Sequence, residues 1–335
     1  MYFNSIVFLR AVAALAVCFF HFTCGNSAYL VDTNWIKIAG KFGSYGVDVF
    51  FVVSGFVIPY SLAQKNYTLS RFFAFMRSRF WRIEIPYLAS LLLAVCMAFL
   101  VASYKKTAFH FDWTQLLAHV LYLNSFIGID WLVPVYWTLA IEFQYYVWIG
   151  LLFPYLLPKK NIFIRYISWG IWIALSFLIP KDVFLFQYVG LFGMGIHLCQ
   201  FHLKQLSKTE CCISMAVCIG LVIGHIGLFS ALIGGIASLF ILYEIAQQKT
   251  IKIPYIWAFL GKTSYSLYLT HVLVAGKVIG FTEQKTTDSF LRIAMIPVAM
   301  LIAVIIAYVF YQVVEKNIIF KNFVFFLSKH NTRKT

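Results

Sequence analysis

Arg10 and His21 lie within one apolar stretch, Ser5 to Cys24, where a charged or titratable side chain is costly. An arginine in a membrane helix costs about 2.5 to 3.5 kcal/mol on insertion scales, so an ionisable residue there is a candidate for function. Their spacing corresponds to about three helical turns, which places both on one face roughly 16 Å apart along the axis. The segment is therefore predicted to be a membrane helix with a functional face.

Three further ionisable residues, Asp48, Glu142 and His271, interrupt other apolar segments. A histidine beside a carboxylate is the minimal arrangement for a general base, because the acid orients the imidazole and stabilises its charged form. We therefore expect His21, Asp48, Glu142 and His271 to be catalytic, provided that the helices bring them to a similar depth. The alternative, that each is a satisfied polar group joining two helices, is equally compatible with the residue types.

Polar residues also follow helical spacing along two of these segments, as expected for faces that line a cavity: Thr138, Glu142, Tyr145 and Tyr146 on one, and Ser264, Tyr268 and His271 on the other. Five glycines, by contrast, are predicted only to permit close helix packing: Gly46, Gly55, Gly193, Gly195 and Gly261.

The composition predicts an all-α, polytopic membrane protein, because 62% of the 335 residues are hydrophobic and only 12% are charged. The apolar runs of about 17 to 25 residues predict about ten membrane helices, at 5–24, 44–62, 83–103, 136–157, 164–180, 183–200, 211–228, 230–246, 256–280 and 290–313. These form a single transmembrane domain over residues 1–315. We expect residues 316–335 to be a short basic cytoplasmic tail.

Basic residues predict the orientation of the bundle in the membrane. Loops on the side of the N-terminus, together with the C-terminal tail, hold roughly twice as many Lys and Arg as the opposite loops, which indicates cytoplasmic termini in a plasma (inner) membrane. The net charge of +15 is thereby explained by topology and anionic lipids, and no nucleic-acid partner is expected. The seven cysteines show no C-x-x-C spacing, so no metal site is expected.

Basic and aromatic residues alternate in the segment 70–82, SRFFAFMRSRFWR. We expect an interfacial amphipathic helix that buries its aromatic rings among lipids and offers Arg71, Arg79 and Arg82 to phosphate groups. Those phosphates belong either to lipid headgroups or to a phosphorylated cofactor, since the arginine fork suits both.

Several motifs, in this order along nearly the whole chain, resemble the integral-membrane acyltransferase-3 family of sugar and glycan O-acyltransferases. They are LRAVAALAVCFFHF at 9–22, GVDVFFVVSGFVI at 46–58, RFFAFMRSRFWRIEIPY at 71–87, YWTLAIEFQYY at 136–146, FQYVGLFGMGIHL at 186–198 and LGKTSYSLYLTHV at 260–272. The resemblance implies functional roles for Arg10, His21, Ser54, Arg79, Arg82, Glu142 and His271. It also implies an acyl-CoA donor, usually acetyl-CoA, on the cytoplasmic side.

On this basis we expect an O-acetyltransferase that moves an acetyl group from acetyl-CoA to an extracytoplasmic or lipid-linked glycan, such as lipopolysaccharide O-antigen. Arg79, Arg82 and Arg71 would hold the nucleotide of the donor, whose pantetheine arm would pass Arg10 and Ser54. His21 would be the general base, Glu142 or Asp48 its orienting acid, and His271 a second proton carrier or oxyanion partner; a covalent acetyl-histidine is equally compatible. The alternative function is a transporter or flippase of a lipid-linked glycan, which broken helices and internal repeats would favour.

Overall fold

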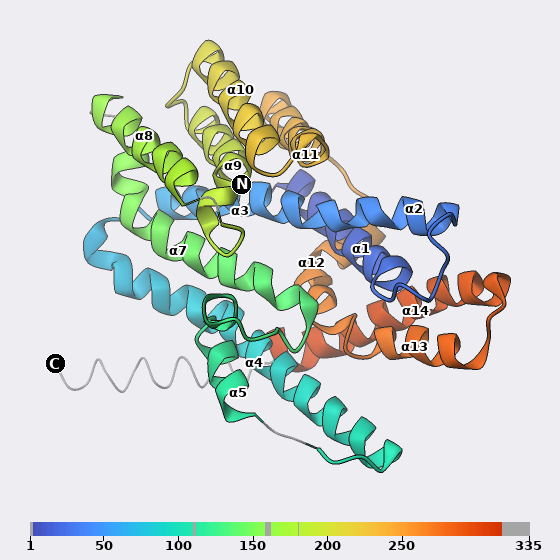
Figure 1. Cartoon of the computed structure of the whole chain (residues 1–335). Coiled ribbons are helices and arrows are strands. Elements are labelled where there is room, and N and C mark those ends of the chain that lie inside the picture. Colours follow the sequence, from blue (N-terminus) through green and yellow to red (C-terminus); the bar gives the residue numbers. More distant parts are fainter. Residues whose placement is uncertain (1–2, 110–111, 158–161, 180, 317–335) are drawn as a thin grey trace.

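The computed structural model describes residues 3–109, 112–157, 162–179 and 181–316. Throughout these residues the regular structure is helical (Figure 1). The α-helices are α1 (Asn4–Cys24), α2 (Trp35–Lys41), α3 (Gly46–Gln64), α4 (Phe72–Lys105), α5 (Trp113–Val120), α6 (Asn124–Ile127), α7 (Trp137–Leu156), α8 (Ile162–Leu178), α9 (Val189–His202), α10 (Lys208–His225), α11 (Leu228–Gln247), α12 (Tyr255–Thr270), α13 (Ala275–Lys285) and α14 (Ser289–Phe310). The expected all-α architecture is confirmed.

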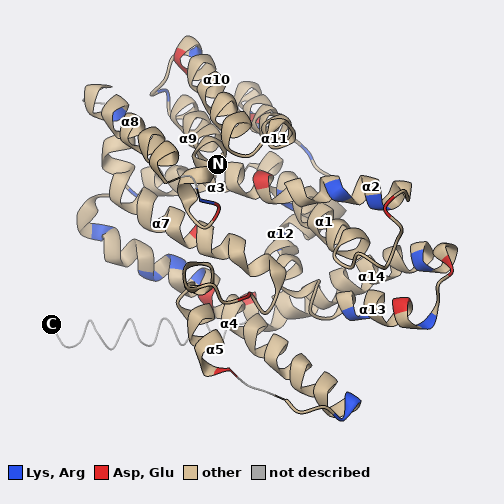
Figure 2. Ribbon diagram, viewed as in Figure 1, with Lys and Arg blue, Asp and Glu red and all other residues tan. Residues whose placement is uncertain are grey.

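Seven helical segments of the described chain are long and apolar enough to cross a membrane, which makes this a multi-pass membrane protein. They contain α1, α3, α4, α7, α10, α11 and α14. Figure 2 shows that the middle stretches of α8, α10 and α14 carry no charged residue. The other three expected spans correspond to α8, α9 and α12, which are shorter than 18 residues. The predicted tail lies outside the described residues, apart from Lys316.

Close helix packing depends on glycine, as expected from the sequence. A Cβ atom added at Gly55 of α3 would lie 2.3 Å from the carbonyl oxygen of Phe192, and one at Gly195 of α9 would lie 2.1 Å from that of Val52. At each of the five glycines predicted for packing, such an atom would come within 3.0 Å of a neighbour. The backbones of α3 and α9 therefore touch directly, which no larger residue allows.

One predicted span is wrong: residues 256–280 do not form a single helix. Helix α12 ends at Thr270, residues 271–274 form turns, and α13 begins at Ala275. The Nδ1 atom of His271 lies 2.9 Å from both the Leu267 and Tyr268 carbonyl oxygens. In a continued helix the Tyr268 carbonyl would accept from the next turn, so the side chain competes with the backbone for it. His271 consequently lies at the end of α12 and not past the middle of a longer helix.

The segment 70–82, expected to be an interfacial amphipathic helix with its aromatic rings among lipids, opens the 34-residue helix α4, and its rings do not all turn outward. One face turns into the protein, where Phe75 packs against Tyr67 with ring centroids 5.8 Å apart and Arg79 is only 9% exposed. The opposite face is open, and Phe73 is 83% exposed there. The buried face and the exposed face thus each carry both an aromatic and a basic residue, Phe75 and Arg79 on the one and Phe73 and Arg77 on the other.

We predict that Gly261→Ala separates α12 from α1. A Cβ atom at Gly261 would lie 2.1 Å from the carbonyl oxygen of Val7, and a rigid helix backbone cannot give way locally. The measurement is the thermal unfolding midpoint in detergent, which should fall. Gly235→Ala is the matched control, because no atom lies within 4 Å of its added Cβ. Equal midpoints for the two variants would contradict this account of the packing.

Candidate active site

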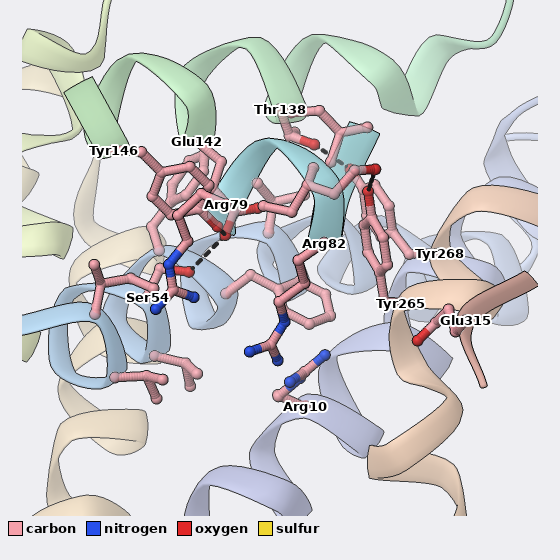
Figure 3. A pocket seen from close by; sticks show the side chains of 18 residues that line it. Arg10, Ser54, Arg79, Arg82, Thr138, Glu142, Tyr146, Tyr265, Tyr268 and Glu315 are labelled. Carbon is pink, nitrogen blue, oxygen red and sulfur yellow. Dashed lines mark hydrogen bonds between the residues drawn. The ribbon is translucent and has the colours of Figure 1, made fainter. Parts of the chain in front are cut away.

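A cavity of about 140 Å³ lies between α1, α3, α4, α7 and α12 (Figure 3). One ordered water needs roughly 10 to 15 Å³ of such space, so the cavity has room for several waters or for part of a ligand. The polar residues on its wall are Arg10, Ser54, Arg79, Arg82, Thr138, Glu142, Tyr146, Tyr265, Tyr268 and Glu315. Five helices and the turn after α14 therefore supply one polar site inside an apolar bundle.

The three arginines of the cavity form no ion pair within 4.0 Å with a carboxylate of the described residues. Arg10 donates from Nε to the Ser264 hydroxyl at 3.2 Å, and Arg79 donates to the Ser61 hydroxyl at 3.4 Å. In the described part of the chain, ion pairs within 4.0 Å join only Lys37 to Asp32 and Arg165 to Glu210. Arg79 is buried, Arg10 is partly buried and Arg82 is exposed, and a buried charge is normally paired, because its desolvation is otherwise uncompensated. The cluster therefore keeps guanidinium donors available for an anionic ligand such as phosphate.

Two carboxylates complete the charge of the cavity, and both are held by hydroxyl groups. Glu142 accepts a hydrogen bond from Ser54 at 3.1 Å and another from Tyr146 of the same helix. Glu315 accepts a hydrogen bond from Ser266. With three arginines and two carboxylates on the wall, the formal charge of the cavity is positive by one.

His21 and His271 form a separate pair outside the cavity wall, with ring centroids 5.2 Å apart. His271 is fully buried, and both partners of its Nδ1 are carbonyl oxygens. Because a carbonyl only accepts, Nδ1 must carry the proton, and Nε2 then presents a lone pair. No described residue donates to this Nε2. The helix break thus fixes His271 as a base with an open acceptor atom.

Tyr268 connects the cavity with the histidine pair. Its ring lines the cavity and lies 6.2 Å, between centroids, from the ring of His271. Its hydroxyl donates to the Val135 carbonyl at 3.0 Å and lies 2.5 Å from the Thr138 hydroxyl. Tyr268 therefore stands between the arginine cluster and the pair formed by His21 and His271.

The connection between α4 and α7 contacts Tyr268, because Val135, which accepts the tyrosine hydrogen bond, belongs to that connection. His119 organises the connection: Nδ1 lies 2.7 Å from the Gln115 carbonyl, and Nε2 accepts from the Leu132 N–H at 2.9 Å. Burial lowers the pKa of His119 below its usual value, which keeps the ring neutral and the Nε2 atom an acceptor. The connection between α4 and α7 is therefore anchored beside the cavity, through the bond from Tyr268 to Val135.

The structure brings most of the predicted site residues together, but not all. Five line the cavity, namely Arg10, Ser54, Arg79, Arg82 and Glu142, while His21 and His271 adjoin each other beyond Tyr268. Asp48 lies elsewhere: it is hydrogen-bonded to Ser230 of α11, and no hydrogen bond joins it to either histidine in the described chain. Arg71 is exposed and donates to the Lys65 carbonyl at 3.1 Å.

Glu315 was missed by the sequence analysis. It is one of only 12 acidic residues in the chain and directly follows the last apolar segment. Because acidic residues are so rare in this chain, a carboxylate at the end of an apolar segment could have indicated a functional residue. Tyr265 was missed as well; it lines the cavity and donates to the Ile83 carbonyl at 2.9 Å.

Comparison with known proteins gives one family. A family model described as an acyltransferase domain, of the acyltransferase-3 type, matches residues 3–312. Among curated proteins, peptidoglycan O-acetyltransferase OatA of Listeria monocytogenes is 31% identical over 174 residues, which are 48% of this chain and 26% of that protein. The chain thus aligns with about a quarter of the length of this relative. No solved structure matches.

We predict that ¹⁵N NMR of histidine-labelled protein finds His271 protonated at Nδ1 and not at Nε2. Its carbonyl partners require this tautomer. His119 is the internal reference, because it should show the same tautomer with an Nε2 that accepts a hydrogen bond. Loss of the signal in His271→Asn assigns it. A proton found on Nε2 of His271 would contradict the geometry described above.

Proposed function

Because the chain belongs to the acyltransferase-3 family, we propose that it transfers an acetyl group from acetyl-CoA, entering from the cytoplasmic side, to a hydroxyl of an extracytoplasmic or lipid-linked glycan. The observation that carries this proposal is the cavity with three arginines that have no ion-pair partner in the described chain. Such a cluster suits a donor with several phosphate groups, and the adjoining histidine pair suits proton transfer at the acyl group.

In this proposal, four arginines hold different parts of the donor. Arg79 and Arg82 bind phosphate oxygens of the nucleotide, and Arg71 extends the site at the exposed start of α4. Arg10, fixed by Ser264, faces the pantetheine arm. Ser54 and Glu142 offer a hydroxyl and a carboxylate to the amide groups of that arm. The thioester then points toward Tyr268 and the histidines.

His21 removes the proton from the attacking glycan hydroxyl in this mechanism. The hydroxyl oxygen forms a bond to the thioester carbonyl carbon, the carbon–sulfur bond breaks, and the proton passes to the leaving thiolate. His271 is the partner nearest to His21, and its open Nε2 makes it the second proton carrier. Glu142 and Asp48 hydrogen-bond neither histidine, so we assign Glu142 to the donor side. An acetyl-histidine intermediate remains compatible with the same residues.

The family and the relative indicate only the chemical class of the acceptor. The relative is named for O-acetylation of peptidoglycan, and a surface glycan such as O-antigen offers hydroxyl groups of the same kind. The break in α12 is a feature that the transporter alternative anticipated. Membership of an acyltransferase family outweighs it, since a chain that only moves glycans needs neither a donor site nor a base. We place the protein in the inner membrane with cytoplasmic termini.

The donor site is tested by replacing Arg79 and Arg82 together with glutamine. Coenzyme A affinity should fall by roughly a hundredfold or more, because charge-assisted phosphate contacts are worth about 1.5 to 3 kcal/mol each. Isothermal titration of the purified protein in detergent measures it. Arg77→Gln is the matched control: it lies on the same helix but in an aromatic groove outside the cavity. If the double variant bound coenzyme A with wild-type affinity, the cavity would not be the donor site.

The catalytic proposal is tested by His21→Gln, which keeps a polar side chain but removes the proton acceptor. Acetyl transfer should fall by about 10²-fold or more, as is typical for a lost general base. The measurement is O-acetyl groups per surface glycan, compared with total glycan displayed. His225→Gln is the control, because His225 bonds Ser176 on the far helices α8 and α10. Normal acetylation in His21→Gln, or lost glycan display without any acetylation in the parent, would favour the transporter.

A further inference from the structure

The turn that follows α14 carries a charged residue into the cavity. Residues Tyr311–Glu315 form a π-turn, and this turn brings Glu315 to the cavity wall. Turns of this kind are rare and occur frequently at functional sites. Two contacts tie the turn to α12: the Lys262 ammonium lies 5.7 Å from the Tyr311 ring centroid, and Ser266 donates to Glu315. Glu315 is therefore held in place and does not simply end a helix.

The two carboxylates of the cavity lie at different ends of it. Glu142 shares hydrogen bonds with Ser54 and Tyr146, at the end of the cavity where Arg79 lies (Figure 3). Glu315 lies at the opposite end beside Arg10 and Arg82, and it is attracted by both charges without forming an ion pair within 4.0 Å in the described chain. Its negative charge thus helps to compensate Arg10 and Arg82, and Arg10 is attracted by Glu142 as well.

We propose that Glu315 is a positioning residue that sets how tightly the arginine cluster holds the anionic part of the donor. The inference rests on the proposed function, because it takes a phosphate-bearing donor as the ligand. While the cavity is empty, the carboxylate compensates Arg10 and Arg82. Once the donor is bound, the same charge repels the phosphates, which weakens binding and lets the coenzyme product leave. Removing the charge should therefore tighten binding of the anionic ligand and slow turnover.

The experiment compares Glu315→Gln with the wild-type protein in detergent, using coenzyme A and uncharged pantetheine as two probes. Glutamine keeps an acceptor for Ser266 and removes only the charge. We expect the Kd for coenzyme A to fall about tenfold, as for loss of one nearby repelling charge in a partly screened site. The Kd for pantetheine should not change. In turnover assays with acetyl-CoA, KM should fall and kcat should fall with it, because product release becomes slower.

Glu210→Gln is the matched control, since it removes one carboxylate charge outside the cavity, where Glu210 pairs with Arg165; it should bind coenzyme A like the wild type. An unchanged or raised Kd for coenzyme A in Glu315→Gln overturns the inference, and so does an equal change for pantetheine. If Glu315→Gln aggregates, coenzyme A present during extraction should restore folded protein by replacing the lost charge; persistent aggregation counts against the inference. A wild-type protein that binds no coenzyme A contradicts the proposed function itself.

Discussion

The position of α1 is the constraint on which the site depends, and a buried carboxylate fixes it. Glu244 of α11 accepts hydrogen bonds from the backbone N–H groups of Asn4 at 3.0 Å and Ser5 at 2.8 Å, at the start of α1, and from Ile251 at 3.2 Å. The N–H groups of Asn4 and Ser5 have no partner within α1. The start of the helix is also the positive end of its dipole, which favours an anion. With its start capped in this way, α1 presents Arg10 and His21 at fixed heights to α12, whose Ser264 and His271 meet them.

A second consequence of this arrangement is that charge and base are kept apart. The arginines, the carboxylates and several hydroxyl groups gather in the cavity, whereas the histidine pair lies beyond Tyr268. A histidine beside three guanidinium groups would be disfavoured in its protonated form by like-charge repulsion. Separation by one aromatic ring lets a site for an anionic ligand and a proton-accepting group coexist in the same bundle. The apolar surroundings increase the strength of both interactions, because less water screens them.

The sequence predicts this fold well where a single helix decides the outcome. The apolar runs predict α1 to within one residue, and the glycine positions predict where helices touch. The sequence predicts poorly the features that depend on how a helix is rotated about its axis, or on a side chain that competes for a backbone hydrogen bond. Asp48 and Ser54 are six residues apart, about 240° around the helix, and periodicity cannot tell which of them faces the cavity. The break after Thr270 arises from a histidine bonding a backbone carbonyl, which apolar patterning does not register.

The break in α12 has a different meaning here from the broken helices of transporters. There, freed backbone groups at the ends of half-helices bind the substrate or ion directly. In this chain the carbonyl groups at the break are engaged by the His271 ring, by which the tautomer of that ring is fixed. The chain after the break folds into α13, which packs against α14 and not across the cavity. The break therefore orients a base at the end of a helix, and that is a requirement of group transfer rather than of permeation.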